Sequence, residues 1–129
     1  MKFNFFNNKT ILITGGTGSF GKSMVNKILR SSNPKKVIIF SRDELKQFEM
    51  SNDLNFKNNK KIRFFIGDIR EKDRLKLAFN GVDIVIHAAA LKQISTAEYN
   101  PFEAIKTNII GAQNIIEAAL ELNVKKIIA

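Results

Sequence analysis

Cysteine is absent from this sequence and histidine occurs only once. The chain therefore forms no disulfide and offers no thiolate to a metal, and one histidine argues against a structural zinc site. No apolar run approaches the roughly 20 residues that cross a bilayer. Residues 1–8 are also too short and too polar for a secretory signal. We expect a cytoplasmic protein with no metal site and no membrane contact.

Acidic residues are scarce as well: 12 Asp and Glu stand against 21 Lys and Arg, which gives a formal net charge of +9. Proteins that bind single-stranded nucleic acid combine basic residues with exposed aromatic side chains. Here the lysines are scattered among many asparagines, and most phenylalanines fall at the spacing of core positions. We expect a solvated, lysine-rich surface without a nucleic-acid partner, part of which attracts an anionic nucleotide.

Residues 10–21 are the stretch around which the rest of the chain is organised. An apolar strand, 10–14, is followed by three glycines spaced G-x-x-G-x-x-G and then by an amphipathic helix, which is the order of a dinucleotide-binding fingerprint. In such a site Gly15 permits the turn, Gly18 lets the backbone approach a pyrophosphate at the positive end of the helix dipole, and Gly21 permits close helix packing. The alternative is a tight turn without a ligand. The expected buried stripe of the helix comprises Phe20, Met24, Val25, Ile28 and Leu29.

Strands and helices alternate through the remaining residues. The other expected strands are 36–40, 62–66, 82–88 and 124–129, and the other expected helices are 43–54, 72–79 and 101–122. This alternation predicts an α/β Rossmann-type fold, a doubly wound parallel sheet in the order 3-2-1-4-5 with its ligand at the carboxyl ends. The residues expected to face inward from two of these helices are Leu45 and Phe48, and Ile105, Ile109, Ala112, Ile116 and Ala119. Gly111 indicates either the close approach of a neighbour or a tolerated glycine.

The end of the second strand selects between the two nicotinamide cofactors. Ser41 and Arg42 stand there, followed by Asp43. A carboxylate at this place binds a ribose 2′-hydroxyl, whereas an arginine favours a 2′-phosphate. We therefore expect NADP in preference to NAD. The alternative is a solvated Arg42 beside a helix that Asp43 caps.

Two further strand ends contribute candidate residues. Asp68, after the third strand, is placed to accept a hydrogen bond from the adenine amino group, with Ile69 against the ring; a plain turn residue is the alternative for Asp68. The small residues 88–90 after the fourth strand let the backbone lie close to a ribose and nicotinamide. His87 is a possible general base, but we expect a buried histidine held by backbone hydrogen bonds.

Taken together, these segments resemble the extended short-chain dehydrogenase/reductase superfamily. Within it they are most similar to the inverting UDP-N-acetylglucosamine 4,6-dehydratases and related polysaccharide-biosynthesis proteins. The stretches that carry the resemblance are TGGTGSFG (14–21), SRDE (41–44), GDIR (67–70), HAAALKQ (87–93), EYNP (98–101) and TN (107–108).

The resemblance implies an internal redox reaction on a nucleotide sugar. Hydride leaves C4 for NADP⁺, water is lost across C5 and C6, and hydride returns to C6 as C5 inverts. It also implies that Asn108 helps to organise the active site, that Lys92 and Tyr99 contact substrate, and that the longer parent protein is a homo-oligomer. The predicted cofactor-binding residues are Thr14, Gly15, Thr17, Gly18, Ser19, Phe20, Gly21, Ser41, Arg42, Asp68, Ile69, Ala88, Ala89 and Ala90.

One departure from the family pattern concerns the catalytic residues. The family's Thr-Asp-Lys and Tyr-x-x-x-Lys stretches are absent, and the only tyrosine, Tyr99, is followed four residues later by Glu103. We therefore expect residues 1–129 to be an incomplete NAD(P)-binding Rossmann domain without the catalytic segment or the substrate-binding portion. A sugar-nucleotide epimerase or reductase of the same superfamily, a non-catalytic NADP-binding module and an inert truncated product remain the alternatives.

Overall fold

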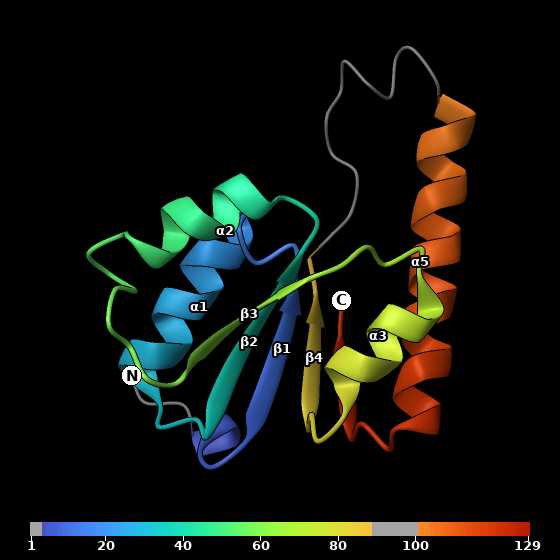
Figure 1. The fold of residues 1–129 in the computed structure, drawn as a ribbon. Helices are drawn as coiled ribbons and strands as arrows, with labels where there is room; N and C mark the ends of the chain where they lie inside the picture. The colour runs from blue at the N-terminus through green and yellow to red at the C-terminus, as the bar shows by residue number, and fades with distance from the viewer. Residues whose placement is uncertain (1–3, 89–100) are drawn as a thin grey trace.

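The computed structural model describes residues 4–88 and 101–129, which form a parallel sheet with helices on both faces (Figure 1). A short 3₁₀ turn, Asn4–Phe6, precedes the first strand. The strands are β1 (Thr10–Thr14), β2 (Lys36–Ser41), β3 (Ile62–Ile66), β4 (Ile84–His87) and β5 (Lys126–Ile128). The helices are α1 (Ser19–Ser31), α2 (Glu44–Ser51), α3 (Lys72–Phe79) and α5 (Pro101–Glu121). The predicted elements are all present, and their ends differ from the expected ones by at most three residues.

The strand order is β3-β2-β1-β4-β5 with every neighbouring pair parallel, which confirms the predicted doubly wound topology. The order reverses beside β1, because the chain moves outward through β2 and β3 and then returns to place β4 on the other side. In the register of the sheet, Thr14 lies between Phe40 of β2 and His87 of β4. The last residues of these three strands therefore meet at one carboxyl edge, below the turn that begins at Gly15.

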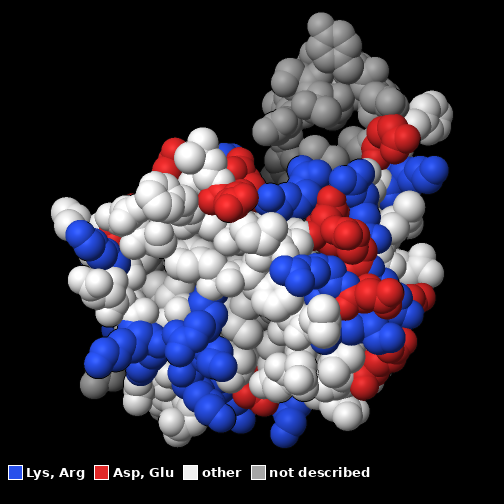
Figure 2. Space-filling view, viewed as in Figure 1, with Lys and Arg blue, Asp and Glu red and all other residues white. Residues whose placement is uncertain are grey.

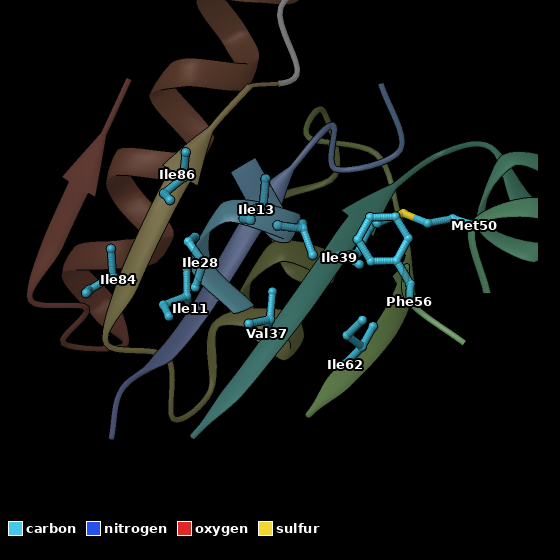
Figure 3. Close-up of a cluster of buried hydrophobic side chains, with 11 residues drawn as sticks. Ile11, Ile13, Ile28, Val37, Ile39, Met50, Phe56, Ile62, Ile84 and Ile86 are labelled. Atoms are coloured by element: carbon cyan, nitrogen blue, oxygen red, sulfur yellow. The ribbon is translucent and has the colours of Figure 1, made fainter. Parts of the chain in front are cut away.

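Alternating strand residues build a separate core on each face of the sheet. One core joins Ile11, Ile13, Val37 and Ile39 to buried residues of α1 and α2 (Figure 3). On the other face Leu12, Phe40 and Val85 pack against α3 and α5. Because both faces are covered, the middle residues of the two central strands, 11–13 and 37–40, are all apolar, as expected for a parallel sheet.

The predicted inward face of α2 is wrong, whereas that of α1 is wrong only at Phe20, since Val25 and Ile28 are fully buried. Leu45 and Phe48 are 64% and 65% exposed, and Phe20 at the start of α1 is 59% exposed. The residues of α2 that point inward are Gln47 and Met50. Asp43 caps the start of α2, because its carboxylate accepts a hydrogen bond from the Lys46 backbone nitrogen at 3.0 Å.

The predicted inward face of α5 is also wrong for its isoleucines. Ile105, Ile109 and Ile116 are each more than half exposed, whereas Ile115 is buried together with Gly111, Ala118 and Ala119. Small residues turn inward because α5 lies close to the chain that follows β3: a Cβ at Gly111 would collide with the Ile69 side chain. Close approach, one of the two explanations offered for Gly111, is therefore confirmed.

Charged side chains are distributed unevenly over the molecule. Figure 2 shows basic residues gathered near the amino ends of the strands, and basic and acidic residues mixed over α3 and α5. In the mixed region Lys72 pairs with Glu117 and Glu121 at 3.0 and 3.2 Å, and Lys76 pairs with Glu121 at 2.7 Å. These ion pairs join the two helices at the surface. Within the described residues, no helix combines the length and the apolar character needed to span a membrane.

Candidate nucleotide-binding site

Residues 15–21 contain four glycines, and those at positions 15, 18 and 21 differ in what the fold requires of them. Gly15 has φ of +67°, a left-handed conformation that favours glycine. At Gly21 a Cβ would lie 2.5 Å from the Gly15 carbonyl oxygen and from the Gly16 Cα, so this glycine lets α1 pack against the turn. At Gly18 a Cβ would meet only the Gly15 oxygen, at an ordinary 3.5 Å. The chain's own packing therefore does not require a glycine at position 18.

The start of α1 offers uncapped backbone donors at the carboxyl edge of the sheet. Gly18 is the N-cap residue, with φ −74° and ψ 171°, and it provides no side-chain cap. The first turn of α1 carries no acidic residue. The first amides of a helix have no carbonyl partner within it, and the helix dipole makes this end attractive to an anion. Thr17, Gly18 and Ser19 line a hollow at this place.

Two lysines extend this hollow toward α2. Lys22 from the first turns of α1 and Lys46 from α2 line it beside the glycine turn, together with Glu49, Met50 and Asp53. Neither lysine was predicted from the sequence as a cofactor residue. Lys46 lies four residues after Arg42, so both cations follow the carboxyl end of β2. This short spacing was the sequence signal that could have placed Lys46 near the site.

Thr14 and His87 connect the ends of β1 and β4. The Thr14 Oγ1 lies 2.8 Å from His87 Nδ1 and accepts a hydrogen bond from the Ala88 backbone nitrogen at 3.0 Å. Burial lowers the pKa of His87, which favours the neutral ring. The expectation of a buried histidine held by backbone hydrogen bonds is wrong in both details, because the ring is half-buried and contacts the threonine hydroxyl. Thr14 is fully buried, so its side chain is not open to a ligand.

Arg42, Asp68 and Arg70 form an ionic cluster after β2 and β3. The Asp68 carboxylate accepts hydrogen bonds from the Arg70 side chain at 2.7 and 3.1 Å and from the Arg70 backbone nitrogen at 2.9 Å. Arg42 Nη1 lies 3.8 Å from Asp68 Oδ2, a longer ion pair. The hydrogen bond from Arg70 holds the pKa of Asp68 below its usual value, with a smaller contribution from Arg42. Asp68 thus remains ionised.

This cluster lies at the rim of a second hollow. Its lining residues are Arg42, Asp43, Glu44, Leu45, Phe48, Asp68 and Arg70. The exposed Leu45 and Phe48 therefore provide apolar surface beside two guanidinium groups. Both chemistries suit a nucleoside, because an aromatic base packs on apolar or guanidinium surfaces.

Ser41 and Ile69 are less accessible than the sequence suggested. Ser41 is buried, and its Oγ accepts a hydrogen bond from Gln47 Nε2 at 2.8 Å. The Ile69 side chain is only 6% exposed and packs in the core, while its carbonyl oxygen accepts a hydrogen bond from Asn114 Nδ2 at 3.0 Å. The expected placement of the Ile69 side chain against an adenine ring is therefore incorrect, because that side chain is committed to Gly111 and the core.

Several predicted residues lie outside the described parts of the chain. They are Ala89, Ala90, Lys92 and Tyr99. Asn108 lies half-buried on α5, one turn before Gly111. Figure 1 shows that the first turns of α5 rise above the carboxyl edge of the sheet.

The residues present fit a dinucleotide. A glycine without a packing requirement stands beside uncapped amides, and an ionised carboxylate and two arginines border an apolar hollow on the same edge. Gly15, Thr17, Gly18 and Ser19 would hold the pyrophosphate, and Arg42 and Asp68 would meet the adenosine end. Within the described residues, no group of three or more carboxylates or histidines could hold a metal ion.

Comparison with known proteins agrees with this fold. The chain is 60% identical over 124 residues to the inverting UDP-N-acetylglucosamine 4,6-dehydratase of Campylobacter jejuni, covering 96% of this chain and 36% of that protein. It is 48% identical to a UDP-glucose 4-epimerase of Rickettsia prowazekii, covering 95% of this chain and 36% of that protein. The chain thus spans little more than a third of these relatives.

Solved structures give the same result. The X-ray structure of Pen from Bacillus thuringiensis superimposes with a TM-score of 0.86 at 48% identity, covering 95% of this chain and 37% of that chain. A DesIV double mutant (dTDP-glucose 4,6-dehydratase) from Streptomyces venezuelae, with NAD and DAU bound, shares the fold at a TM-score of 0.75 and 24% identity, covering 91% and 37%. Residues 11–129 match the family described as polysaccharide biosynthesis protein, and the chain belongs to that family.

Proposed function

We propose that residues 1–129 form the NADP-binding part of a nucleotide-sugar 4,6-dehydratase that acts on UDP-N-acetylglucosamine with inversion at C5. The observation that carries this proposal is the glycine turn, where Gly18 stands beside uncapped amides although the fold itself has space for a side chain. The Campylobacter jejuni relative at 60% identity supports the substrate and the reaction class.

Each group at the carboxyl edge has a defined part in holding the cofactor. The amides at the start of α1 bind the pyrophosphate, the Asp68 carboxylate accepts a hydrogen bond from the adenine amino group, and the exposed guanidinium of Arg42 meets a 2′-phosphate. Bound NADP supplies the acceptor and donor of hydride. The hydrogen-bonded pair of Thr14 and His87 joins the ends of β1 and β4, so that the turn and the Ala88 backbone keep their relative positions.

The chain supplies this binding surface but no acid–base pair for the sugar. A Tyr-x-x-x-Lys pair does not occur in its sequence, and the only tyrosine is Tyr99. Proton transfer to or from a sugar hydroxyl requires a positioned group within hydrogen-bond reach. We therefore assign the chain cofactor binding, with Asn108, Lys92 and Tyr99 as proposed contributors to the sugar side of the site.

Sugar-nucleotide epimerisation is the second candidate, because the Rickettsia prowazekii relative at 48% identity is named a UDP-glucose 4-epimerase. Two chimeras separate the candidates. In each, residues 1–129 replace the matching segment of one relative, either the dehydratase or the epimerase.

We expect 4-keto sugar from UDP-N-acetylglucosamine with the first chimera and little C4 epimer of UDP-glucose with the second, both followed by NMR. A Gly18→Val version of the first chimera should turn over more slowly at limiting NADP, because its cofactor affinity is lower. Turnover by the epimerase chimera alone would favour the second candidate. If neither chimera turns over while both fold, the assignment to this reaction class is wrong.

A further inference from the structure

Of the two arginines that line the second hollow, Arg70 is the one to which the proposed function gives no part. Its guanidinium donates to both oxygens of Asp68, through Nε to Oδ1 at 3.1 Å and through Nη2 to Oδ2 at 2.7 Å. Its backbone nitrogen adds a third contact to Oδ1 at 2.9 Å. A bidentate arginine–carboxylate pair of this kind is both oriented and strong for an exposed site.

Arg42 is held much more loosely by the same carboxylate. Its Nη1 lies 3.8 Å from Oδ2, beyond hydrogen-bond distance, and its side chain is 59% exposed, whereas the Asp68 side chain is 15% exposed. Among the described residues that line this hollow, Arg42 and Arg70 are the only cations. The Asp68 carboxylate is therefore neutralised mainly by Arg70, and the guanidinium of Arg42 makes no hydrogen bond to it.

The distance between these groups matters for a phosphate ligand. A guanidinium is roughly 4 Å across, so a phosphate held on the outer edge of Arg42 would lie within about 8 Å of the Asp68 carboxylate. That separation is close to the Debye length in physiological salt, so the two negative groups would still repel each other. An uncompensated Asp68 would also attract Arg42 to itself and away from the phosphate.

We propose that Arg70 is a specificity-determining residue: it neutralises Asp68 and so keeps Arg42 available to the 2′-phosphate, which sets the preference for NADP over NAD. This inference rests on the proposed cofactor site. NAD carries no 2′-phosphate, so its affinity does not depend on whether Arg42 is free. The affinity ratio of the two cofactors therefore isolates the effect of Arg70 from any general change in the adenine pocket.

The test is calorimetric titration of NADP and NAD into the 129-residue chain and its Arg70→Met variant. We expect the ratio of NADP affinity to NAD affinity to fall about tenfold in the variant. Arg30→Met is the matched control, because it removes the same charge from the exposed C-terminal end of α1, at the opposite edge of the sheet. Its affinity ratio should equal that of the unmodified chain.

A double variant, Asp68→Asn with Arg70→Met, makes the test specific. Removing the carboxylate removes the charge that Arg70 compensates, so the ratio should return to about its original value. An unchanged ratio in Arg70→Met, or a ratio that stays low in the double variant, would overturn the inference while leaving the cofactor site intact. If the unmodified chain binds neither nucleotide, the proposed cofactor site itself fails, and the role of Arg70 fails with it.

Discussion

Replacing Gly18 separates the needs of a ligand from the needs of the fold. The structure leaves space at this position: the nearest atom to a Cβ is the Gly15 oxygen at 3.5 Å, and the backbone angles of −74° and 171° suit any residue. Valine also replaces glycine as the N-cap, which costs less than about 1 kcal/mol of folding free energy. We therefore expect the Gly18→Val chain to fold with nearly unchanged stability.

The same branched side chain would occupy the space where a pyrophosphate approaches the α1 amides. We expect NADP affinity to fall about tenfold or more, which is a binding free energy of about 1.4 kcal/mol. Calorimetric titration measures the affinity, and urea unfolding measures the stability. Gly21→Ala is the contrasting variant, because its Cβ would lie 2.5 Å from backbone atoms and should cost roughly 1–3 kcal/mol of stability. Equal NADP affinity in Gly18→Val and the unmodified chain would refute the assignment of the turn.

Three further predictions concern the cofactor, the histidine and the reaction. Arg42→Ala should weaken NADP binding and leave NAD binding nearly unchanged; an equal loss for both nucleotides in calorimetry would make Arg42 a structural residue. Burial lowers the pKa of His87 in the folded chain, so the unfolded chain takes up a proton first, and stability should decline as pH falls through about 6.5. His87→Gln should flatten that part of the stability profile in urea unfolding at a series of pH values, and an identical profile would exclude His87 as its source. The 129-residue chain, incubated with UDP-N-acetylglucosamine and NADP⁺, should form no 4-keto sugar by NMR, and product above a no-protein control would place the catalytic groups within it.

The sheet and the glycine turn could be predicted because their information is local. Continuous apolar strands and the spacing of Gly15, Gly18 and Gly21 directly reflect backbone geometry and two-sided burial. Strand order then followed from the right-handed crossover rule. The family resemblance, which the comparisons confirm, rested on the same local motifs.

The faces of the helices could not be predicted in the same way. Gln47 is polar and yet points inward, because its amide donates to Ser41 Oγ and to the Phe65 carbonyl oxygen at 2.8 and 3.2 Å. Hydrophobic periodicity alone therefore favoured Leu45 and Phe48. Helix α5 has two apolar stripes, and the stripe that carries Gly111 is the buried one. There the helix lies against the Ile69 side chain, 42 positions earlier in the chain, and a Cβ at position 111 would collide with it.

The role of Arg70 was missed for a similar reason. The sequence places Arg42 and Arg70 in separate motifs. Arg70 lies two residues after Asp68 and contacts it locally, whereas only the parallel pairing of β2 with β3 brings Arg42 to the same carboxylate. Asp68 itself was singled out correctly as a polar residue at the carboxyl edge, and its adenine contact stays a prediction. The alternative role of Asp68 as a turn residue also fits the structure, because its Oδ1 accepts a hydrogen bond from the Arg70 backbone nitrogen.

The most direct test of the central claim is an NMR titration of the isotope-labelled chain with NADP. The account predicts that amide resonances shift for Gly15 to Gly21, for Arg42 and for Asp68, at the carboxyl edge of the sheet, and that NAD produces the same pattern with a smaller effect at Arg42. Saturable NADP binding whose shifts instead cluster at the amino ends of the strands, or no shift at all in a folded chain, would contradict the assignment of this edge as the cofactor site.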